Sequence, residues 1–221
     1  VESKEQIPAD FSGAVLQVLE SQLVYTELLE EFYSHPQDKL IAIAVTGTNG
    51  KTSSTYMIEA LLNEAGVPCG VMGTIDHHFR NKVWKSELTT PDTQSFYQRL
   101  HEFVDAGAKA YTMEVSSHAL KQKRVATGFD VAVFTNFTRD HLDYHGSMED
   151  YWESKQLLFT EQLKPSGEVF AILNNDDPQV AKTKVAKNAQ RITFSRSSPE
   201  SKSHFQFTIK SSSLSGLEFS V

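Results

Sequence analysis

Ile-Ala-Ile-Ala-Val-Thr-Gly-Thr-Asn-Gly-Lys-Thr-Ser, residues 41–53, is the stretch of sequence that decides the fold. Its apolar start is rich in β-branched residues and stops at Gly47, which predicts a strand followed by a tight turn. A helical pattern begins at Thr52. Gly47 and Gly50 let backbone N–H groups turn toward an anion, and the helix start adds unpaired N–H donors and the positive end of its dipole. The stretch therefore predicts a phosphate-binding loop between a strand and a helix.

Two residues of this loop have the chemistry of a nucleotide site. Lys51 can reach the outer phosphates, and the Thr52 hydroxyl can bind Mg²⁺. The common P-loop pattern has a further glycine five residues before Gly50, where this chain has Val45. A plain tight turn is therefore the alternative, and the rest of the chain has to decide between them.

Composition bounds the class of protein. The chain has 221 residues and a net charge of −7 without a basic block, so nucleic acid is not expected as the main partner. A single cysteine, Cys69, excludes an internal disulfide framework and fits a reducing compartment. No signal peptide or membrane-spanning apolar run is found, so we expect a cytoplasmic protein with no membrane partner. The oligomeric state is not readable, and a monomer is the simpler expectation.

Strands and helices alternate along the chain after an N-terminal helical segment. Expected strands cover residues 40–45, 71–75, 108–115, 130–137, 168–173 and 191–194, and expected helices cover 11–33, 52–65, 92–105, 147–163 and 178–187. A Ser-rich loop at 195–203 precedes a predicted β-hairpin of 204–209 and 214–221. The pattern predicts an α/β fold: a doubly wound, mostly parallel sheet of P-loop type with an edge β-hairpin near the C-terminus.

Polar clusters follow the central predicted strands. Besides the phosphate loop, they are Glu114 with residues 116–118, residues 135–145, and residues 174–177. Ligands of doubly wound sheets bind at the carboxyl ends of the strands, so we expect these clusters to meet. The Glu114 carboxylate would suit Mg²⁺, although a polar strand end is the alternative. His141 lies between Asp140 and Asp143, which could fix its tautomer for metal binding, although a solvated loop histidine is the alternative.

Lys155 interrupts an apolar stripe of the helix that begins near Ser147. Met148, Tyr151, Trp152 and Phe159 form this stripe at helical spacing. One interpretation is a lysine that extends past its aromatic neighbours to solvent. The other is a lysine directed into the site, where burial lowers the pKa of the amine and the neutral form can react with CO₂ to give a carbamate.

The segment 88–92, Leu-Thr-Thr-Pro-Asp, precedes the third expected helix. Its hydroxyls and the following N-terminal amides could bind an anionic substrate, and a plain capping turn is the alternative. His77, His78 and His101 have no such context and are interpreted as structural or solvated.

Together these stretches resemble the central ATPase domain of the Mur ligase family, most closely its MurE group. That group adds the third amino acid to UDP-N-acetylmuramoyl-L-alanyl-D-glutamate in peptidoglycan synthesis. The similarity covers residues 32–194 and is carried by 45–52, 89–92, 113–120, 138–146 and 151–159. The phosphate loop is common to all Mur ligases and folylpolyglutamate synthases, whereas Thr-Thr-Pro-Asp, Ser-Ser-His-Ala-Leu and Asp-His-Leu-Asp-Tyr-His-Gly indicate the narrower group.

The resemblance implies a role for each matching residue. The ATP phosphates would be bound by Gly47, Thr48, Asn49, Gly50, Lys51, Thr52 and Ser53. Mg²⁺ would be bound by Thr52, Glu114 and His141, and a second Mg²⁺ would be supported by carbamylated Lys155. The catalytic set would be Lys51, Lys155, Glu114 and His141. The UDP-muramoyl-dipeptide would contact Thr89, Thr90, Ser116, Gln122 and Arg124. Relatives often have asparagine where this chain has Leu88, so one substrate contact is expected to be missing.

The implied reaction is ATP-dependent amide formation. A substrate carboxylate attacks the γ-phosphate of ATP, and an amine then displaces phosphate from the acyl phosphate. Residues 1–38 would be the remnant of an N-terminal uridine-binding domain or a linker, and residues 39–221 a truncated central ATP-binding domain. With its C-terminal amino-acid-binding domain absent, the fragment is not expected to ligate alone. Meso-diaminopimelate and L-lysine both remain open as the added amino acid.

Two other functions remain open from the sequence. One is another enzyme of the same superfamily, such as a folylpolyglutamate or cyanophycin synthetase. Such an enzyme would not be expected to carry Thr-Thr-Pro-Asp and Ser-Ser-His-Ala-Leu together. The other is a non-catalytic nucleotide-binding module, which would have no need of Lys155.

Overall fold

Parallel strands form the centre of the structure, as the alternation predicts. The computed structural model describes residues 8–15, 17–125, 128–198, 202–213 and 216–221. Its strands are β1 (Ile41–Thr46), β2 (Cys69–Met72), β3 (Asp76–Phe79), β4 (Lys82–Lys85), β5 (Ala110–Glu114), β6 (Val131–Phe134), β7 (Phe170–Asn174), β8 (Gln190–Arg196), β9 (Phe205–Ser213) and β10 (Gly216–Ser220). Its helices are α1 (Ser21–Phe32), α2 (Lys51–Glu64), α3 (Thr93–Asp105), α4 (Ser117–Lys121), α5 (Leu142–His145) and α6 (Met148–Thr160), with 3₁₀ turns η2 (Pro36–Lys39) and η3 (Val180–Lys182).

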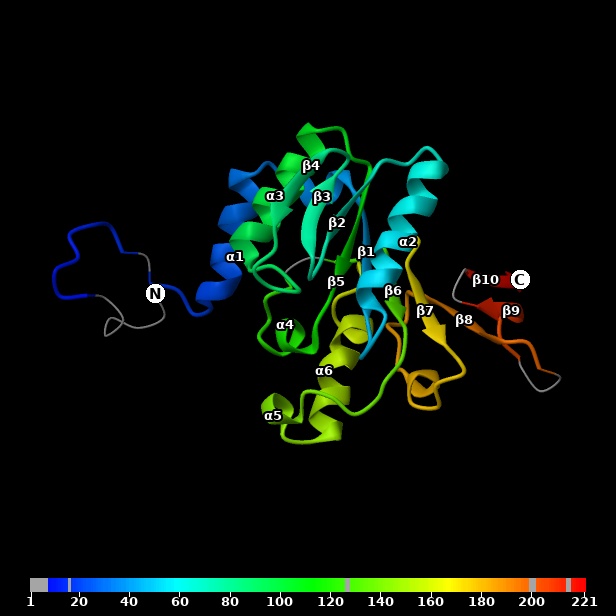
Figure 1. The fold of residues 1–221 in the computed structure, drawn as a ribbon. Helices are drawn as coiled ribbons and strands as arrows, with labels where there is room; N and C mark the ends of the chain where they lie inside the picture. Colours follow the sequence, from blue (N-terminus) through cyan, green and yellow to red (C-terminus); the bar gives the residue numbers. More distant parts are fainter. Residues whose placement is uncertain (1–7, 16, 126–127, 199–201, 214–215) are drawn as a thin grey trace.

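The strand order places β1 at the centre of the sheet. The described strands form one sheet in the order β10-β9-β8-β7-β6-β1-β5-β2-β3-β4 (Figure 1). Strands β2, β5, β1, β6, β7, β8 and β9 run parallel, and the antiparallel pairs are β2–β3, β3–β4 and β9–β10. The chain crosses from β5 past β1 to β6, so the direction of winding switches beside the end of β1. This confirms the doubly wound α/β fold and the edge hairpin.

Helices cover both faces of the sheet. Successive side chains of β1 point to opposite faces of the sheet. Ala42 and Ala44 lie on one face, in the main apolar core with residues of α3 and α6. Helix α2 packs on β1, β2 and β5 from the other side. Figure 1 shows α1 outside α3, on the side of β2, β5 and β1 away from α2. The small β1 side chains let α3 and α6 approach, and the larger aromatic residues of those helices fill the core.

The N-terminal helix is shorter than predicted. The prediction of a helix from residue 11 is wrong for the described residues before Ser21, where α1 begins. Hydrogen bonds hold α1 to α3, from Tyr97 Oη to Glu30 Oε1 at 2.6 Å and from Gln22 Nε2 to Thr93 Oγ1 at 2.8 Å. Leu19 is 98% exposed and has no such support. Helical spacing without tertiary packing does not maintain a short helix.

The helix predicted at 178–187 is also wrong, because only the η3 turn forms there. The Arg191 guanidinium donates to the carbonyls of Thr183, at 2.7 Å, and of Ala181. Those carbonyls would be acceptors within a continuing helix. Thr183 itself has φ −53° and ψ 126°, which ends the turn.

Three short elements were not predicted. The β3–β4 hairpin turns at Arg80, which has φ 54°, and its strands have only four residues each. Trp84 of β4 packs on Phe103 with ring centroids 5.9 Å apart. Helices α4 and α5 span five and four residues. Across the described parts of the chain, none of the helices has the length and apolar character needed to span a bilayer.

The turn after β1 provides the first prediction. Gly47 has φ 146°, and a Cβ there would lie 1.9 Å from the Thr135 Oγ1 and 3.2 Å from the Asn136 backbone. Thr135 cannot easily move, because this hydroxyl donates to the Asn49 carbonyl at 2.7 Å. We expect Gly47→Ala to lower the free energy of unfolding by about 3 kcal/mol.

Urea denaturation of the protein measures this loss, and Gly66→Ala is the matched control. Gly66 also has a positive φ, of 77°, but a Cβ there would have nothing within 4 Å. The control should therefore lose only the conformational cost, about 1 kcal/mol. Equal losses of unfolding free energy in the two variants would show that the contact of a Cβ at Gly47 with Thr135 and Asn136 has no cost of its own.

Candidate functional site

A cavity of about 690 Å³ opens at the carboxyl ends of β1 and β5. Its walls come from the phosphate loop, the segment after β2, the 88–90 segment, the end of β5, α4, and the segment before α5. The lining residues are Thr48, Asn49, Gly50, Lys51, Thr52, Thr74, Leu88, Thr89, Thr90, Glu114, Ser116, Ser117, His118, Gln122, Arg124, His141 and Lys155. Most of the predicted site residues therefore share one cavity, and Gly47 and Ser53 lie in the same loop and helix start.

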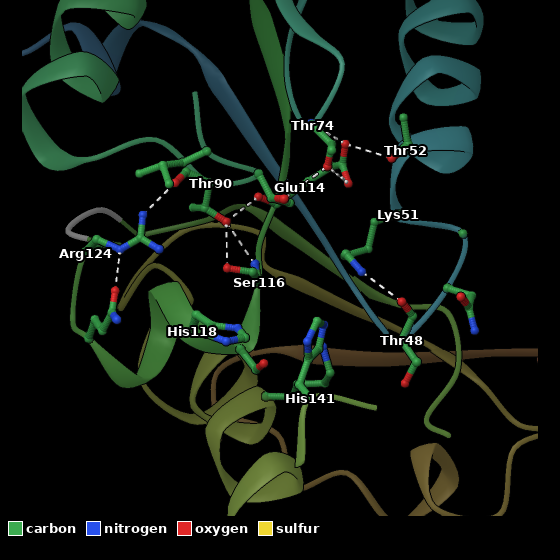
Figure 2. Close-up of a pocket in the computed structure, with 17 residues that line it drawn as sticks. Thr48, Lys51, Thr52, Thr74, Thr90, Glu114, Ser116, His118, Arg124 and His141 are labelled. Atoms are coloured by element: carbon green, nitrogen blue, oxygen red, sulfur yellow. Dashed lines mark hydrogen bonds between the residues drawn. The ribbon is translucent and has the colours of Figure 1, made fainter. Parts of the chain in front are cut away.

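The phosphate loop is fixed by the segment that follows β6. The Thr48 N–H donates to the Asn136 carbonyl at 2.9 Å, and the Asn49 N–H donates to the Asn136 Oδ1 at 3.0 Å. Lys51 bends back over the loop and donates to the carbonyls of Gly47 and Thr48 at 3.0 and 2.9 Å (Figure 2). Burial lowers the pKa of Lys51. The loop is therefore already shaped without a ligand, and Lys51 can exchange these carbonyls for a phosphate.

Glu114 lies almost fully buried between two segments of the cavity wall. It accepts hydrogen bonds from the Thr52 hydroxyl at 2.9 Å, and from the Thr74 N–H at 2.8 Å and the Thr74 hydroxyl at 3.2 Å (Figure 2). Gly73 makes room for the carboxylate, since a Cβ there would lie 2.3 Å from Oε1. Thr74 was not among the predicted residues. Its position just after β2, next to β5 in the sheet, is the signal that could have identified it.

The donor set of Thr52 and Glu114 fits a hard cation. Both supply oxygen, which Mg²⁺ prefers, and Mg²⁺ usually keeps several of its waters and needs few protein ligands. Within the described ranges no group of three or more His, Cys, Asp or Glu side chains could hold a metal. The fit is therefore to a cation that is bound largely by water and by other oxygen groups.

His141 reaches the cavity from the start of α5. It has a left-handed backbone, φ 51°, and its side chain is 42% exposed. The expected neighbouring carboxylate is present, because the Asp140 Oδ2 lies 3.5 Å from the His141 Nε2, at the distance of an ion pair. The His118 ring lies 5.0 Å from the His141 ring, edge to face (Figure 2). His118 belongs to the polar cluster predicted after β5, but no role was predicted for it.

Lys155 points into the site and not to solvent, so the solvent-reaching interpretation is wrong. It is 1% exposed and donates to the Gly47 carbonyl at 3.0 Å. Its ammonium lies 4.8 Å from the centre of the Tyr151 ring. Burial, together with the charge of Lys51, holds the pKa of Lys155 well below its ordinary value. A lowered pKa increases the share of the neutral amine, which is the form that the second interpretation requires.

The residues expected to bind an anionic substrate form one connected wall. The Thr90 hydroxyl donates to the Glu114 carbonyl at 2.9 Å and lies 3.2 Å from the Ser116 hydroxyl. Arg124 donates to the Thr90 carbonyl at 2.6 Å and to the Gln122 Oε1 at 2.9 Å (Figure 2). The Thr74 and Thr89 hydroxyls lie 3.1 Å apart, within hydrogen-bond distance.

Asp92 caps α3, as predicted, and accepts from the Ser95 N–H at 3.0 Å. The polar cluster after β7 braces the segment after β6 and does not line the cavity. Asn174 donates to the Thr135 carbonyl at 2.8 Å, and the Asp177 carboxylate accepts from the Phe137 N–H at 2.6 Å.

Comparison with protein families identifies this architecture. The sequence model of the Mur ligase middle domain matches residues 45–220, which covers both the loop and the strands that carry the site. The chain belongs to the Mur ligase family.

Related sequences and structures agree with this assignment. The chain is 46% identical over 166 residues to a UDP-N-acetylmuramoyl-L-alanyl-D-glutamate--2,6-diaminopimelate ligase from Geobacter sulfurreducens, covering 73% of this chain and 33% of that protein. It is 39% identical over 190 residues to the Aquifex aeolicus protein of the same name, and the match covers 86% of this chain and 39% of that protein. The chain thus spans about a third of the length of these relatives.

Solved structures show the same fold. A structure of a UDP-N-acetylmuramoyl-L-alanyl-D-glutamate--2,6-diaminopimelate ligase aligns with a TM-score of 0.73 at 29% identity, covering 92% of this chain and 42% of that chain. Mycobacterium tuberculosis folylpolyglutamate synthase complexed with ADP aligns with a TM-score of 0.65 at 19% identity, and the match covers 87% of this chain and 48% of that chain. The second likeness concerns the fold alone.

The burial of Lys155 provides the second prediction. We expect Lys155→Met to raise the free energy of unfolding by about 1–2 kcal/mol in CO₂-free buffer, because Met fills similar space without a buried charge. The folded-state pKa of Lys155 lies below its ordinary value of 10.5. The unfolded chain therefore binds more protons, and the cost of Lys155 disappears as pH rises through the folded pKa toward 10.5.

Urea denaturation of both proteins over a pH series measures the difference, which should be largest at low pH and shrink toward alkaline pH. Lys164→Met is the control, because Lys164 is 28% exposed and paired with Asp130 at 2.8 Å. Lys164→Met should not raise the free energy of unfolding. A Lys155→Met protein less stable than the parent at neutral pH would contradict the expectation.

Proposed function

We propose that this chain is the central ATP-binding part of a cytoplasmic ligase of peptidoglycan precursor synthesis. The proposed reaction joins an amino acid to UDP-N-acetylmuramoyl-L-alanyl-D-glutamate and converts ATP to ADP and phosphate. The observation that carries the proposal is the buried Lys155 against the phosphate loop, in the same cavity as Glu114 and Thr52. The names of the relatives support 2,6-diaminopimelate as the amino acid.

In this proposal residues 1–38 belong to the end of a uridine-binding domain or a linker, and residues 39–221 to the ATP-binding domain. Helix α1 bonds to α3 through Tyr97 and Glu30, which would fix the relative position of the two parts. The chain alone would lack the part that binds the amino acid, so ligation requires the longer protein.

The phosphate loop would bind ATP through its backbone. The N–H groups from Gly47 to Ser53 and the positive end of α2 suit the phosphate oxygens, and Lys51 would move from the loop carbonyls to the outer phosphates. Thr52, Glu114 and His141 would bind Mg²⁺, with waters and phosphate oxygens completing its ligands. When bound, Mg²⁺ neutralises charge on the phosphates.

Lys155 would act as a carbamate. Its neutral amine attacks CO₂, forms an N–C bond and loses a proton, so that a buried cation becomes an anion. The anion would support a second Mg²⁺. This change would remove the repulsion between two lysines that both contact the Gly47 carbonyl.

The wall formed by Thr89, Thr90, Ser116, Gln122 and Arg124 would position the UDP-muramoyl-dipeptide. Arg124 and the hydroxyls would direct the terminal carboxylate toward the γ-phosphate of ATP. The carboxylate oxygen attacks phosphorus and ADP leaves. The amine of the amino acid then forms the amide bond, and phosphate leaves with a proton lost from nitrogen. Lys51 would offset the charge on the transferred group.

The longer protein tests the proposal directly. We expect it to form the amide from ATP, the UDP-muramoyl-dipeptide and diaminopimelate, and to prefer diaminopimelate to L-lysine. Lys155→Ala should lower kcat by about 10²–10³-fold, because it removes the carbamate charge from the site. Acetate should restore part of the rate by placing a carboxylate in the space that remains.

Lys164→Ala is the matched control for loss of a lysine and should retain the parental rate. ADP release measured with purified substrates, together with mass detection of the amide, gives the readout. A protein that binds ATP but makes no amide with either amino acid would contradict the proposed function.

Leu88 provides a further prediction. It lies in the cavity wall, 47% exposed, where the resemblance places asparagine. We expect Leu88→Asn to lower KM for the UDP-muramoyl-dipeptide about three- to tenfold by adding a hydrogen-bonding side chain. Leu88→Met tests the effect of size alone and should leave KM unchanged. An equal KM in all three proteins would show that the substrate does not reach this residue.

A further inference from the structure

A chain of hydrogen bonds joins three helices behind one wall of the cavity. Ser117 is the first residue of α4, His145 the last of α5, and Asp150 lies in the first turn of α6. The Ser117 Oγ lies 2.9 Å from the His145 Nε2, and the His145 Nδ1 lies 2.7 Å from the Asp150 Oδ2. The His145 side chain has no exposed surface. We call these residues the Ser-His-Asp relay.

The hydrogen bonds of the relay have a direction. Asp150 accepts from Lys121 and from His145, and these bonds lower the pKa of its carboxyl group. An ionised carboxylate only accepts, so the His145 Nδ1 carries the hydrogen. In the neutral tautomer that we infer for this pair, Nε2 has no hydrogen and accepts, so the Ser117 hydroxyl donates to it.

This direction determines what Ser117 offers to the cavity. Ser117 is 1% exposed and lines the cavity together with its neighbours Ser116 and His118. Because its proton is directed to His145, only its oxygen lone pairs are available to a ligand. Lysine and arginine side chains elsewhere in the wall donate hydrogen bonds. Ser117 therefore complements a different part of a ligand, one that has an N–H group.

We propose that Ser117 accepts a hydrogen bond from an N–H group of the substrates, and that His145 and Asp150 are positioning residues that fix it as an acceptor. This inference rests on the proposed function. The N–H group could come from the peptide amide of the UDP-muramoyl-dipeptide or from the amine of the added amino acid.

Steady-state kinetics of the longer protein tests the relay. Ser117→Ala removes the acceptor, and Asp150→Asn lets an amide donate to the His145 Nδ1, so that Nε2–H donates to Ser117 and turns its proton to the cavity. Each variant should lower kcat/KM about tenfold. Because both substitutions act on one hydrogen bond, the double variant should also lose about tenfold in kcat/KM rather than a hundredfold.

The substrate whose KM rises identifies the N–H group. A rise confined to KM for the dipeptide substrate identifies the peptide amide, and a rise confined to KM for the amino acid identifies the amine.

Ser147→Ala is the matched control for disturbance of α6. Ser147 caps this helix by accepting from the Asp150 N–H at 3.1 Å, and the variant weakens the helix start without changing the relay. Its Tm should fall at least as far as that of Asp150→Asn, with kcat/KM retained. Effects that multiply in the double variant, or an Asp150→Asn loss no larger than that of Ser147→Ala, would overturn the proposal.

A second measurement does not depend on catalysis. Imidazole ¹⁵N shifts of the longer protein at neutral pH, assigned with His145→Gln, should show His145 protonated at Nδ1 alone. Protonation at Nε2, or at both nitrogens, would overturn the relay whether or not the protein turns over. Absence of amide formation by the parent protein, with the expected tautomer present, would instead contradict the proposed function and leave Ser117 assigned as an acceptor in the cavity.

Discussion

The close approach of the loop after β1 to the segment after β6 is the constraint on which the site depends. At Gly47 the backbone passes so near Thr135 that no side chain fits. The same segment accepts hydrogen bonds from the N–H groups of Thr48 and Asn49 and thereby fixes the loop. The polar cluster after β7 holds this segment in turn, through Asn174 and Asp177. Three neighbouring strand ends thus support one phosphate-binding turn, and the change of winding beside β1 is what brings them together.

Two lysines converge on this turn. Lys51 and Lys155 both donate to the Gly47 carbonyl at 3.0 Å, although they come from different helices. Burial lowers the pKa of each, and for Lys155 the charge of Lys51 adds to the effect. Such a pair is costly for the fold unless an anion lies nearby. In the proposed function a phosphate and a carbamate would supply such anions, and this would be a physical reason for a lysine in an otherwise aromatic stripe.

Much of this arrangement could be predicted from the sequence. The alternation of strands and helices predicted the sheet, and the glycines around Lys51 predicted the loop, because both patterns are local. Lys155 was identified by its conflict with the apolar stripe around it. The conflict left two interpretations, and only the packing of α6 on the sheet distinguishes them.

The rest depends on contacts between distant segments. The helical spacing before Ser21 has no partner to pack on. The η3 segment loses its carbonyls to Arg191, which comes close to it only when β8 has formed beside β7. Thr74 approaches Glu114 because β2 pairs with β5, which no local pattern shows. The direction of the hydrogen bond from Ser117 depends on His145, which is 28 residues further along the chain, and on Asp150, which follows His145.

The described conformation also explains how Lys51 can serve the loop in two states. Its ammonium donates to the carbonyls of Gly47 and Thr48 in the described conformation. With a phosphate present, the charge-assisted bond to the phosphate is stronger than a bond to a carbonyl, so the side chain gains by moving. Lys155 also donates to the Gly47 carbonyl, at 3.0 Å. The carbonyl therefore has a second donor besides Lys51, so the conformation of the turn does not depend on Lys51 alone.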